Sequence, residues 1–115
     1  MKTKLSFLVL FSVIIAMVSC SKDEEPAPTP VVKVTYNKDA KPIFVASCTP
    51  CHVTGGANPN KWDDYTSAKN KIDLILDRVN RDATAAGFMP KSGTKLPAAT
   101  ISILTQWKTD GLLEN

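Results

Sequence analysis

Apolar residues recur at three- and four-residue intervals in a segment near the middle of the chain. The apolar members of this segment are Tyr65, Ala68, Ile72, Ile75, Leu76 and Val79. That spacing places them along one face of an α-helix, and Asp64, just before the segment, is suited to cap the first turn. We predict a helix here whose apolar face packs into the core rather than binding a ligand.

The stretch DAKPIFVASCTPCH, earlier in the chain, predicts another helix. Asp39 can serve as its N-cap, which places Pro42 in the first turn, where the missing N–H of proline is not needed. We expect this helix to run from about Ala40 to Thr49. It would bring a C-x-x-C-H segment, residues 48–52, to its C-terminal end.

A third helix is predicted from near Pro97 to near Asp110. Its apolar stripe consists of Ile101, Ile103, Leu104 and Trp107. Gly111 follows at the position where a left-handed cap is expected. No segment alternates apolar and polar residues for long enough to predict a strand, although residues 31–36 can form a short extended arm. The sequence therefore predicts a small all-α domain of about three helices.

The N-terminal stretch MKTKLSFLVLFSVIIAMVSC has the layout of an export signal. Lys2 and Lys4 precede an apolar run, Leu5 to Val18, that is shorter than the roughly 20 residues of a spanning helix. Met17-Val18-Ser19-Cys20 resembles the lipobox of bacterial lipoproteins, and this resemblance implies cleavage before Cys20 and acylation of that cysteine. The alternative is an ordinary secretory signal that leaves Cys20 as an extra thiol.

The segment after Cys20, SKDEEPAPTP, is charged and then proline-rich, so we expect an extended tether. The predicted organisation is a signal peptide over 1–19, a lipidated cysteine and flexible linker over 20–35, and one domain over 36–115. The net charge of the 115 residues is +3, and loss of Lys2 and Lys4 with the signal leaves +1. No basic patch remains, so nucleic acid is not an expected partner.

Cys48, Cys51 and His52 allow three kinds of chemistry: a zinc site, a cysteine pair that forms a disulfide, and covalent haem attachment. A structural zinc ion takes four ligands, and the chain has no second histidine. A thioredoxin-like redox pair lies at a helix N-terminus in a βαβ fold, whereas this pair follows a predicted helix. A plain structural disulfide remains open on geometry. Haem attachment accounts for both cysteines and for the histidine.

Met89 provides a separate indication of haem. It is the one methionine left after Met1 and Met17 leave with the signal, and it lies in the polar, proline-bounded stretch AAGFMPKSG. Electron-transferring c-type cytochromes commonly use histidine and methionine as axial ligands, so Met89 is the candidate sixth ligand. The alternative is a methionine that fills a gap in the core. A covalent haem would also complete the core of so small a domain.

Residues 36–115 resemble a small class I c-type cytochrome domain. The resemblance rests on YNKDAKPIFVASCTPCH, on the Gly-x-Met-Pro segment at 87–90, and on the C-terminal ILTQWKTDG. It implies a cytochrome c-like fold wrapped around one haem c, with thioethers at Cys48 and Cys51 and axial ligation by His52 and Met89.

The same resemblance implies further contacts around the haem. Trp107 is expected to pack near the junction of the terminal helices. In VTGGANPNKW, Pro59 is the candidate for a backbone carbonyl that bonds the proximal imidazole, although the family's usual Gly-Pro order is absent. Arg78 and Arg81 have two open readings: they contact haem propionates, or they solvate the end of the second helix.

The sequence thus predicts a lipid-anchored one-electron carrier in the bacterial cell envelope, facing the periplasm or the cell surface. Redox proteins would be its partners, and it would act as a monomer or as a subunit of a respiratory complex. We expect no enzymatic turnover, since the one histidine is assigned to iron. The alternative is a haem protein with an open sixth site that acts as a small-ligand sensor or a peroxidase-like enzyme.

Overall fold

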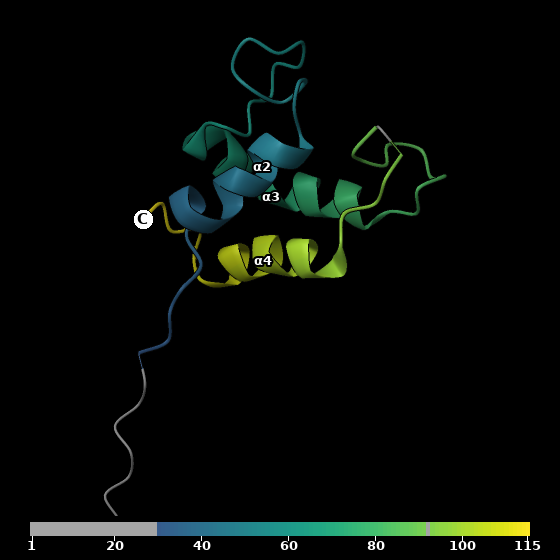
Figure 1. Ribbon diagram of the computed structural model, residues 1–115. Helices are drawn as coiled ribbons and strands as arrows, with labels where there is room; N and C mark the ends of the chain where they lie inside the picture. The colour runs from purple at the N-terminus through teal and green to yellow at the C-terminus, as the bar shows by residue number, and fades with distance from the viewer. Residues whose placement is uncertain (1–29, 92) are drawn as a thin grey trace, which may run out of the picture. The chain divides into compact units, whose positions relative to one another are not determined.

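A computed structural model describes residues 30–91 and 93–115. Within these residues the chain forms a π-helical turn and three α-helices: η2 (Tyr36–Ala40), α2 (Lys41–Ser47), α3 (Tyr65–Asn80) and α4 (Ala98–Thr109) (Figure 1). The same residues contain no strand beyond an isolated bridge. The prediction of a small all-α domain is therefore confirmed. The predicted signal peptide and Cys20 lie outside the described residues.

The first helical segment starts earlier than predicted. Asp39 does not cap it, because η2 already begins at Tyr36 and the Asp39 carboxylate accepts a hydrogen bond from the Thr35 N–H at 2.8 Å. Burial of Tyr36 and Ala40 accounts for the additional turn. Pro42 lies in the first turn of α2, as expected, and α2 ends at Ser47.

Helix α3 agrees with the prediction at both its cap and its face. The Asp64 carboxylate accepts a hydrogen bond from the Ser67 N–H at 2.8 Å and thereby caps the first turn. The buried residues of α3 are Ala68, Ile72, Ile75 and Val79. Tyr65 and Leu76 are partly buried and pack against the same core.

Helix α4 follows Pro97 and ends at Thr109, with Asp110 as its C-cap. Gly111 then takes a positive φ of 96°, as predicted for a left-handed cap. Of its predicted stripe, Leu104 and Trp107 are buried and Ile101 packs against the core. Ile103 is 39 % exposed, so its assignment to the stripe was wrong. It directly precedes Leu104, and adjacent helical positions point in different directions.

An aromatic cluster joins the first helical segment to α4. The Tyr36 ring lies 5.6 Å from the Trp107 ring and 6.3 Å from the Phe44 ring, measured between centroids. The Tyr36 hydroxyl donates to the Trp62 carbonyl at 2.8 Å, and Trp107 Nε1 donates to the Leu113 carbonyl at 2.9 Å. Trp107 thus packs where the terminal helices meet, as expected. Burial raises the pKa of Tyr36 to about 12.

The two ends of the folded part are joined by backbone pairing. Thr35 forms a parallel bridge with Leu113, and the Tyr36 N–H donates to the Leu113 carbonyl at 2.8 Å. The Val34 N–H donates to Asp110 Oδ2 at 2.7 Å. Of the predicted arm, Thr35 is extended, with φ of −122° and ψ of 160°, whereas Tyr36 already belongs to η2. None of the helices within residues 30–91 and 93–115 is long and apolar enough to cross a bilayer.

Candidate haem-binding site

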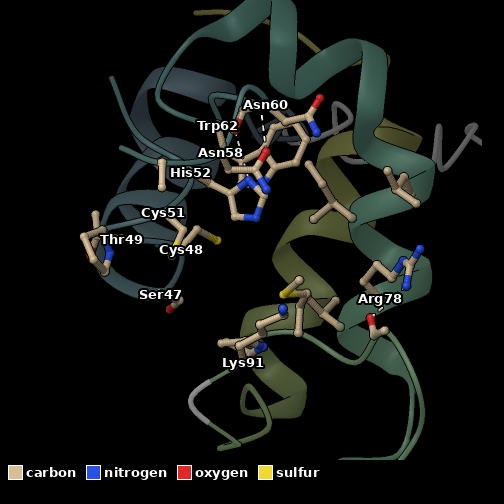
Figure 2. Close-up of a pocket in the computed structure, with 18 of the residues that line it drawn as sticks. Ser47, Cys48, Thr49, Cys51, His52, Asn58, Asn60, Trp62, Arg78 and Lys91 are labelled. Atoms are coloured by element: carbon tan, nitrogen blue, oxygen red, sulfur yellow. Dashed lines mark hydrogen bonds between the residues drawn. The ribbon is translucent and has the colours of Figure 1, made fainter. Parts of the chain in front are cut away.

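A cavity of about 800 Å³ opens between the loop that follows α2, one side of α3, and the loop that precedes α4. Its volume falls within the usual range for ligand and cofactor sites. The end of α2 contributes Ser47, and the loop after it contributes Cys48 to His52, Ala57 to Asn60, and Trp62. Helix α3 contributes Leu74, Ile75, Arg78 and Val79. The loop before α4 contributes Gly87, Met89, Pro90, Lys91 and Leu96. Figure 2 shows His52, Cys48 and Cys51 on one side of this cavity and Arg78 across from them.

The structure brings together all four residues predicted to bind haem, because Cys48, Cys51, His52 and Met89 line the same cavity. Their roles toward a haem stay predictions. Cys20, the predicted lipidation site, lies outside the described residues.

Cys48 is the C-cap of α2, and its carbonyl accepts a hydrogen bond from the His52 N–H at 2.9 Å, which folds residues 48–52 into a compact turn. Both thiols are free, so the structure contains no disulfide between Cys48 and Cys51. The Cys48 thiol is mostly buried, and this burial raises its pKa to about 11. Cys51 is exposed. The two sulfurs therefore differ in their accessibility to solvent.

The imidazole of His52 is fixed from two sides. His52 Nδ1 lies 2.9 Å from the Asn60 carbonyl oxygen. A carbonyl can only accept, so Nδ1 carries the proton and Nε2 of the neutral ring keeps its lone pair for a ligand. Trp62 stacks on the ring, with 4.9 Å between centroids and 13° between planes. The backbone N–H of Trp62 donates to the His52 carbonyl at 2.7 Å.

The carbonyl that holds His52 belongs to Asn60, so the prediction of Pro59 was wrong by one residue. A turn in the same loop is responsible: Asn58 Oδ1 accepts a hydrogen bond from the Asn60 N–H at 2.9 Å, which spans Pro59. Sequence reasoning also missed Trp62. An aromatic residue ten positions after the histidine follows no spacing rule that would have identified it as a partner of the ring.

Gly56 allows the loop to fold onto the C-x-x-C-H segment. A Cβ atom at this position would overlap the carbonyl oxygens of Pro50 and Cys51. The Gly56 N–H donates to the Val53 carbonyl at 2.8 Å, and the Gly56 carbonyl accepts from Lys61 Nζ at 2.7 Å. The absence of a side chain at Gly56 therefore permits this close approach.

Met89 lies in the loop before α4, partly buried against the core. The alternative role in packing therefore remains alongside its place in the cavity wall. The Met89 N–H donates to the Arg78 carbonyl at 3.2 Å. The guanidinium of Arg78 donates to the Gly87 carbonyl at 3.1 Å, and that of Arg81 donates to the Ala86 carbonyl at 2.6 Å. In this structure both arginines bind the Met89 loop rather than only solvent.

The donor set of the cavity fits a haem c. Among residues 30–91 and 93–115, no group of three or more His, Cys, Asp or Glu side chains could hold a metal ion. A haem iron does not need such a group, because the macrocycle supplies its other ligands and the protein supplies only the axial ones. The apolar side chains of Leu74, Ile75 and Val79 line the α3 wall and suit an apolar macrocycle.

Comparison of the chain with protein-family models, with curated proteins and with solved structures finds no match. The residues that line the cavity therefore provide the indication of function.

Proposed function

We propose that this chain is a membrane-tethered monohaem c-type cytochrome that carries one electron at a time between redox proteins. The observation that carries the proposal is the convergence of Cys48, Cys51, His52 and Met89 on one cavity of about 800 Å³. A bound haem c would supply the reversible one-electron chemistry. The protein's own part is to hold the group, to fix its ligands and to limit the access of water.

Each residue of the set has a distinct part in the proposal. Cys48 and Cys51 have free thiols, which thioether attachment requires. His52 would bind iron through Nε2, and the Asn60 carbonyl at Nδ1 would fix the tautomer and raise the basicity of the ring. Met89 would supply the sixth ligand, which raises the reduction potential relative to a second histidine.

The polar side chains of the cavity favour an electron carrier over an enzyme. No Asp or Glu is among the residues that line it. General acid-base catalysis there would depend on His52, which the proposal assigns to iron. Arg78 and Lys91 are the cationic groups of the lining, and neither is an effective base at neutral pH.

A visible spectrum of protein matured with a c-haem assembly system tests the proposal. We expect a low-spin haem c spectrum, a weak long-wavelength band from sulfur to ferric iron, and slow uptake of carbon monoxide by the ferrous form. Met89→Leu is the matched control, because it keeps the side-chain size and removes the sulfur: the band should vanish and carbon monoxide should bind rapidly. Colourless protein would overturn the proposal. A high-spin spectrum with rapid uptake in the unchanged chain would favour the sensor or peroxidase-like alternative.

We further propose that Cys20 is acylated and anchors the protein to the membrane, on the basis of the lipobox-like Met17–Cys20. Two or more acyl chains are enough for stable anchoring. Cys20→Ser should release the protein into the soluble fraction while leaving its visible spectrum unchanged. A Cys20→Ser protein that stays with the membranes after a high-salt wash would contradict lipid anchoring.

A further inference from the structure

The last turn of α3 holds the Met89 loop at three points. Arg78 makes two of these contacts: its carbonyl accepts from the Met89 N–H at 3.2 Å, and its Nη1 donates to the Gly87 carbonyl at 3.1 Å. Arg81 makes the third, from Nη1 to the Ala86 carbonyl at 2.6 Å. The backbone of Ala86, Gly87 and Met89 is therefore held by two arginine side chains and by one backbone carbonyl.

The guanidinium groups also fit closely against the loop. Gly87 has a positive φ of 76°, and a Cβ atom there would overlap the guanidinium of Arg78 and approach that of Arg81. The Asp77 carboxylate lies 2.6 Å from Arg81 Nη2 and 3.8 Å from Arg78 Nε, so it restrains both side chains. Arg78 is 37 % exposed and Arg81 is 33 % exposed, so both groups are partly withdrawn from water.

This arrangement bears on the sixth ligand because methionine is unbranched and flexible, so the position of its sulfur depends on where the backbone is held. The described residues between α3 and α4, 81–91 and 93–97, contain no helix to fix that backbone. A charged donor bonded to a carbonyl contributes more than a neutral one, and the rigid fork of arginine fixes direction as well as distance.

We propose that Arg78 is a positioning residue that holds Met89 within reach of the haem iron, with Arg81 securing the same loop. The inference rests on the proposed function, since it assigns Arg78 a part in methionine ligation. Arg78 would act through the loop backbone and not by touching the iron. The two interpretations that the sequence left open, contact with haem propionates and solvation of the helix end, did not include this contact with the loop.

The test compares Arg78→Met with Lys71→Met in matured protein. Both changes remove one positive charge from α3 and keep an unbranched stem, but Lys71 is exposed and is not among the cavity residues. We expect Arg78→Met to raise the rate of carbon monoxide uptake about 10-fold and to weaken the sulfur-to-iron band, as loss of one hydrogen bond from a partly exposed charged group implies. Lys71→Met should leave both unchanged.

Hydrogen exchange gives a readout that does not depend on the iron. The Met89 amide should exchange about 10-fold faster in Arg78→Met than in Lys71→Met, while the buried amides of α3 keep their protection. An equal loss of protection throughout α3 would mean that Arg78 stabilises the whole fold, and it would overturn the positioning role. If Arg78→Met does not fold, Arg78→Lys replaces it, and a roughly 3-fold increase in carbon monoxide uptake is expected because charge is kept and the fork is lost.

The outcomes separate this inference from the proposed function. Suppose that the sulfur-to-iron band is present in the original protein and absent in Met89→Leu. If Arg78→Met then leaves the band and the rate of carbon monoxide uptake unchanged, the positioning role is refuted and the cytochrome proposal stays intact. Absence of the band from the original protein would refute methionine ligation, and the role of Arg78 with it.

Discussion

Replacing Gly56 with alanine would place a methyl group where the chain folds back onto the C-x-x-C-H segment. The added Cβ atom would overlap the carbonyl oxygens of Pro50 and Cys51, which are backbone atoms and cannot rotate away. Gly56 itself cannot move freely, because its N–H is bonded to Val53 and its carbonyl to Lys61. The segment that carries both cysteines must therefore shift.

The expected cost follows from the effect of forcing additional methyl groups into packed sites, about 1–3 kcal/mol. In a domain of this size, each kcal/mol lowers the midpoint of thermal unfolding by roughly 4–8 °C. Gly93→Ala is the control, since a Cβ atom there meets nothing within 4 Å, although its φ of +86° adds backbone strain. Gly56→Ala should also lower the yield of covalently attached haem, whereas Gly93→Ala should not.

Urea denaturation followed by far-ultraviolet circular dichroism measures the free energy of unfolding, and mass spectrometry of intact protein measures the fraction with haem attached. A Gly56→Ala protein with the original unfolding free energy and full haem attachment would show that the loop does not approach the cysteines as closely as described. Loss of stability without loss of attachment would mean that the loop shifts away from residues 48–52 instead of displacing them.

Three further predictions concern the core, the thiols and acid stability. Trp107→Phe should lower the free energy of unfolding, measured by urea denaturation, by about 1–3 kcal/mol. The substitution shrinks a fully buried side chain and removes the hydrogen bond from the indole N–H to the Leu113 carbonyl. An unchanged free energy of unfolding would contradict the burial of Trp107. In haem-free protein at mildly alkaline pH, a maleimide should label Cys51 faster than Cys48, since burial raises the pKa of Cys48 to about 11; equal rates by peptide mapping would mean that the turn is not folded as described. The hydrogen bond from the Val34 N–H lowers the pKa of the Asp110 carboxyl group in the folded protein below its usual 3.8. The ionised carboxylate therefore stabilises the folded state above pH 3.8, and this stabilisation is lost as the pH falls through the pKa of the folded state. Asp110→Asn should accordingly reduce the loss of unfolding free energy below about pH 4, and an identical acid profile in the variant would refute this linkage.

Part of the fold could be predicted from the sequence because it depends on contacts between residues that are close together in the chain. The α3 helix follows from the spacing of its apolar residues, and its cap depends only on Asp64 and the N–H of Ser67, three positions later. The end of α4 was predictable for the same reason, because Gly111 is suited to the positive φ found there. In each case the decisive partners lie within one turn of each other.

The start of the first helical segment was not predictable, because distant partners determine it. Tyr36 is held by the Trp62 carbonyl and by contact with Trp107, which are far away in the sequence. These contacts extend the helical path back to Tyr36 and leave Asp39 to bond Thr35 instead of capping a helix. A cap preference is worth only about 1 kcal/mol, less than the burial of an aromatic side chain.

The candidate site likewise has residues that the sequence pattern predicts and contacts that only the folded structure shows. Cys48, Cys51 and His52 could be grouped from the C-x-x-C-H spacing alone, and Met89 could be added because no other methionine follows the predicted signal peptide. Asn60 could not be selected over Pro59, since the turn made by the neighbouring asparagine side chain decides which carbonyl reaches the imidazole. The contacts of the arginines with the Met89 loop also required the positions of both elements.

The pairing of Thr35 with Leu113 places the two ends of the helical domain next to each other. The cavity lining starts at Ser47 and ends at Leu96, so neither terminal segment contributes to it. Such a unit could be inserted into a surface loop of another protein, or have its ends joined and new ones opened elsewhere, without rebuilding the cavity walls. Under the proposed function, a domain of this layout would be a suitable module for adding an electron-carrying site to a designed protein assembly.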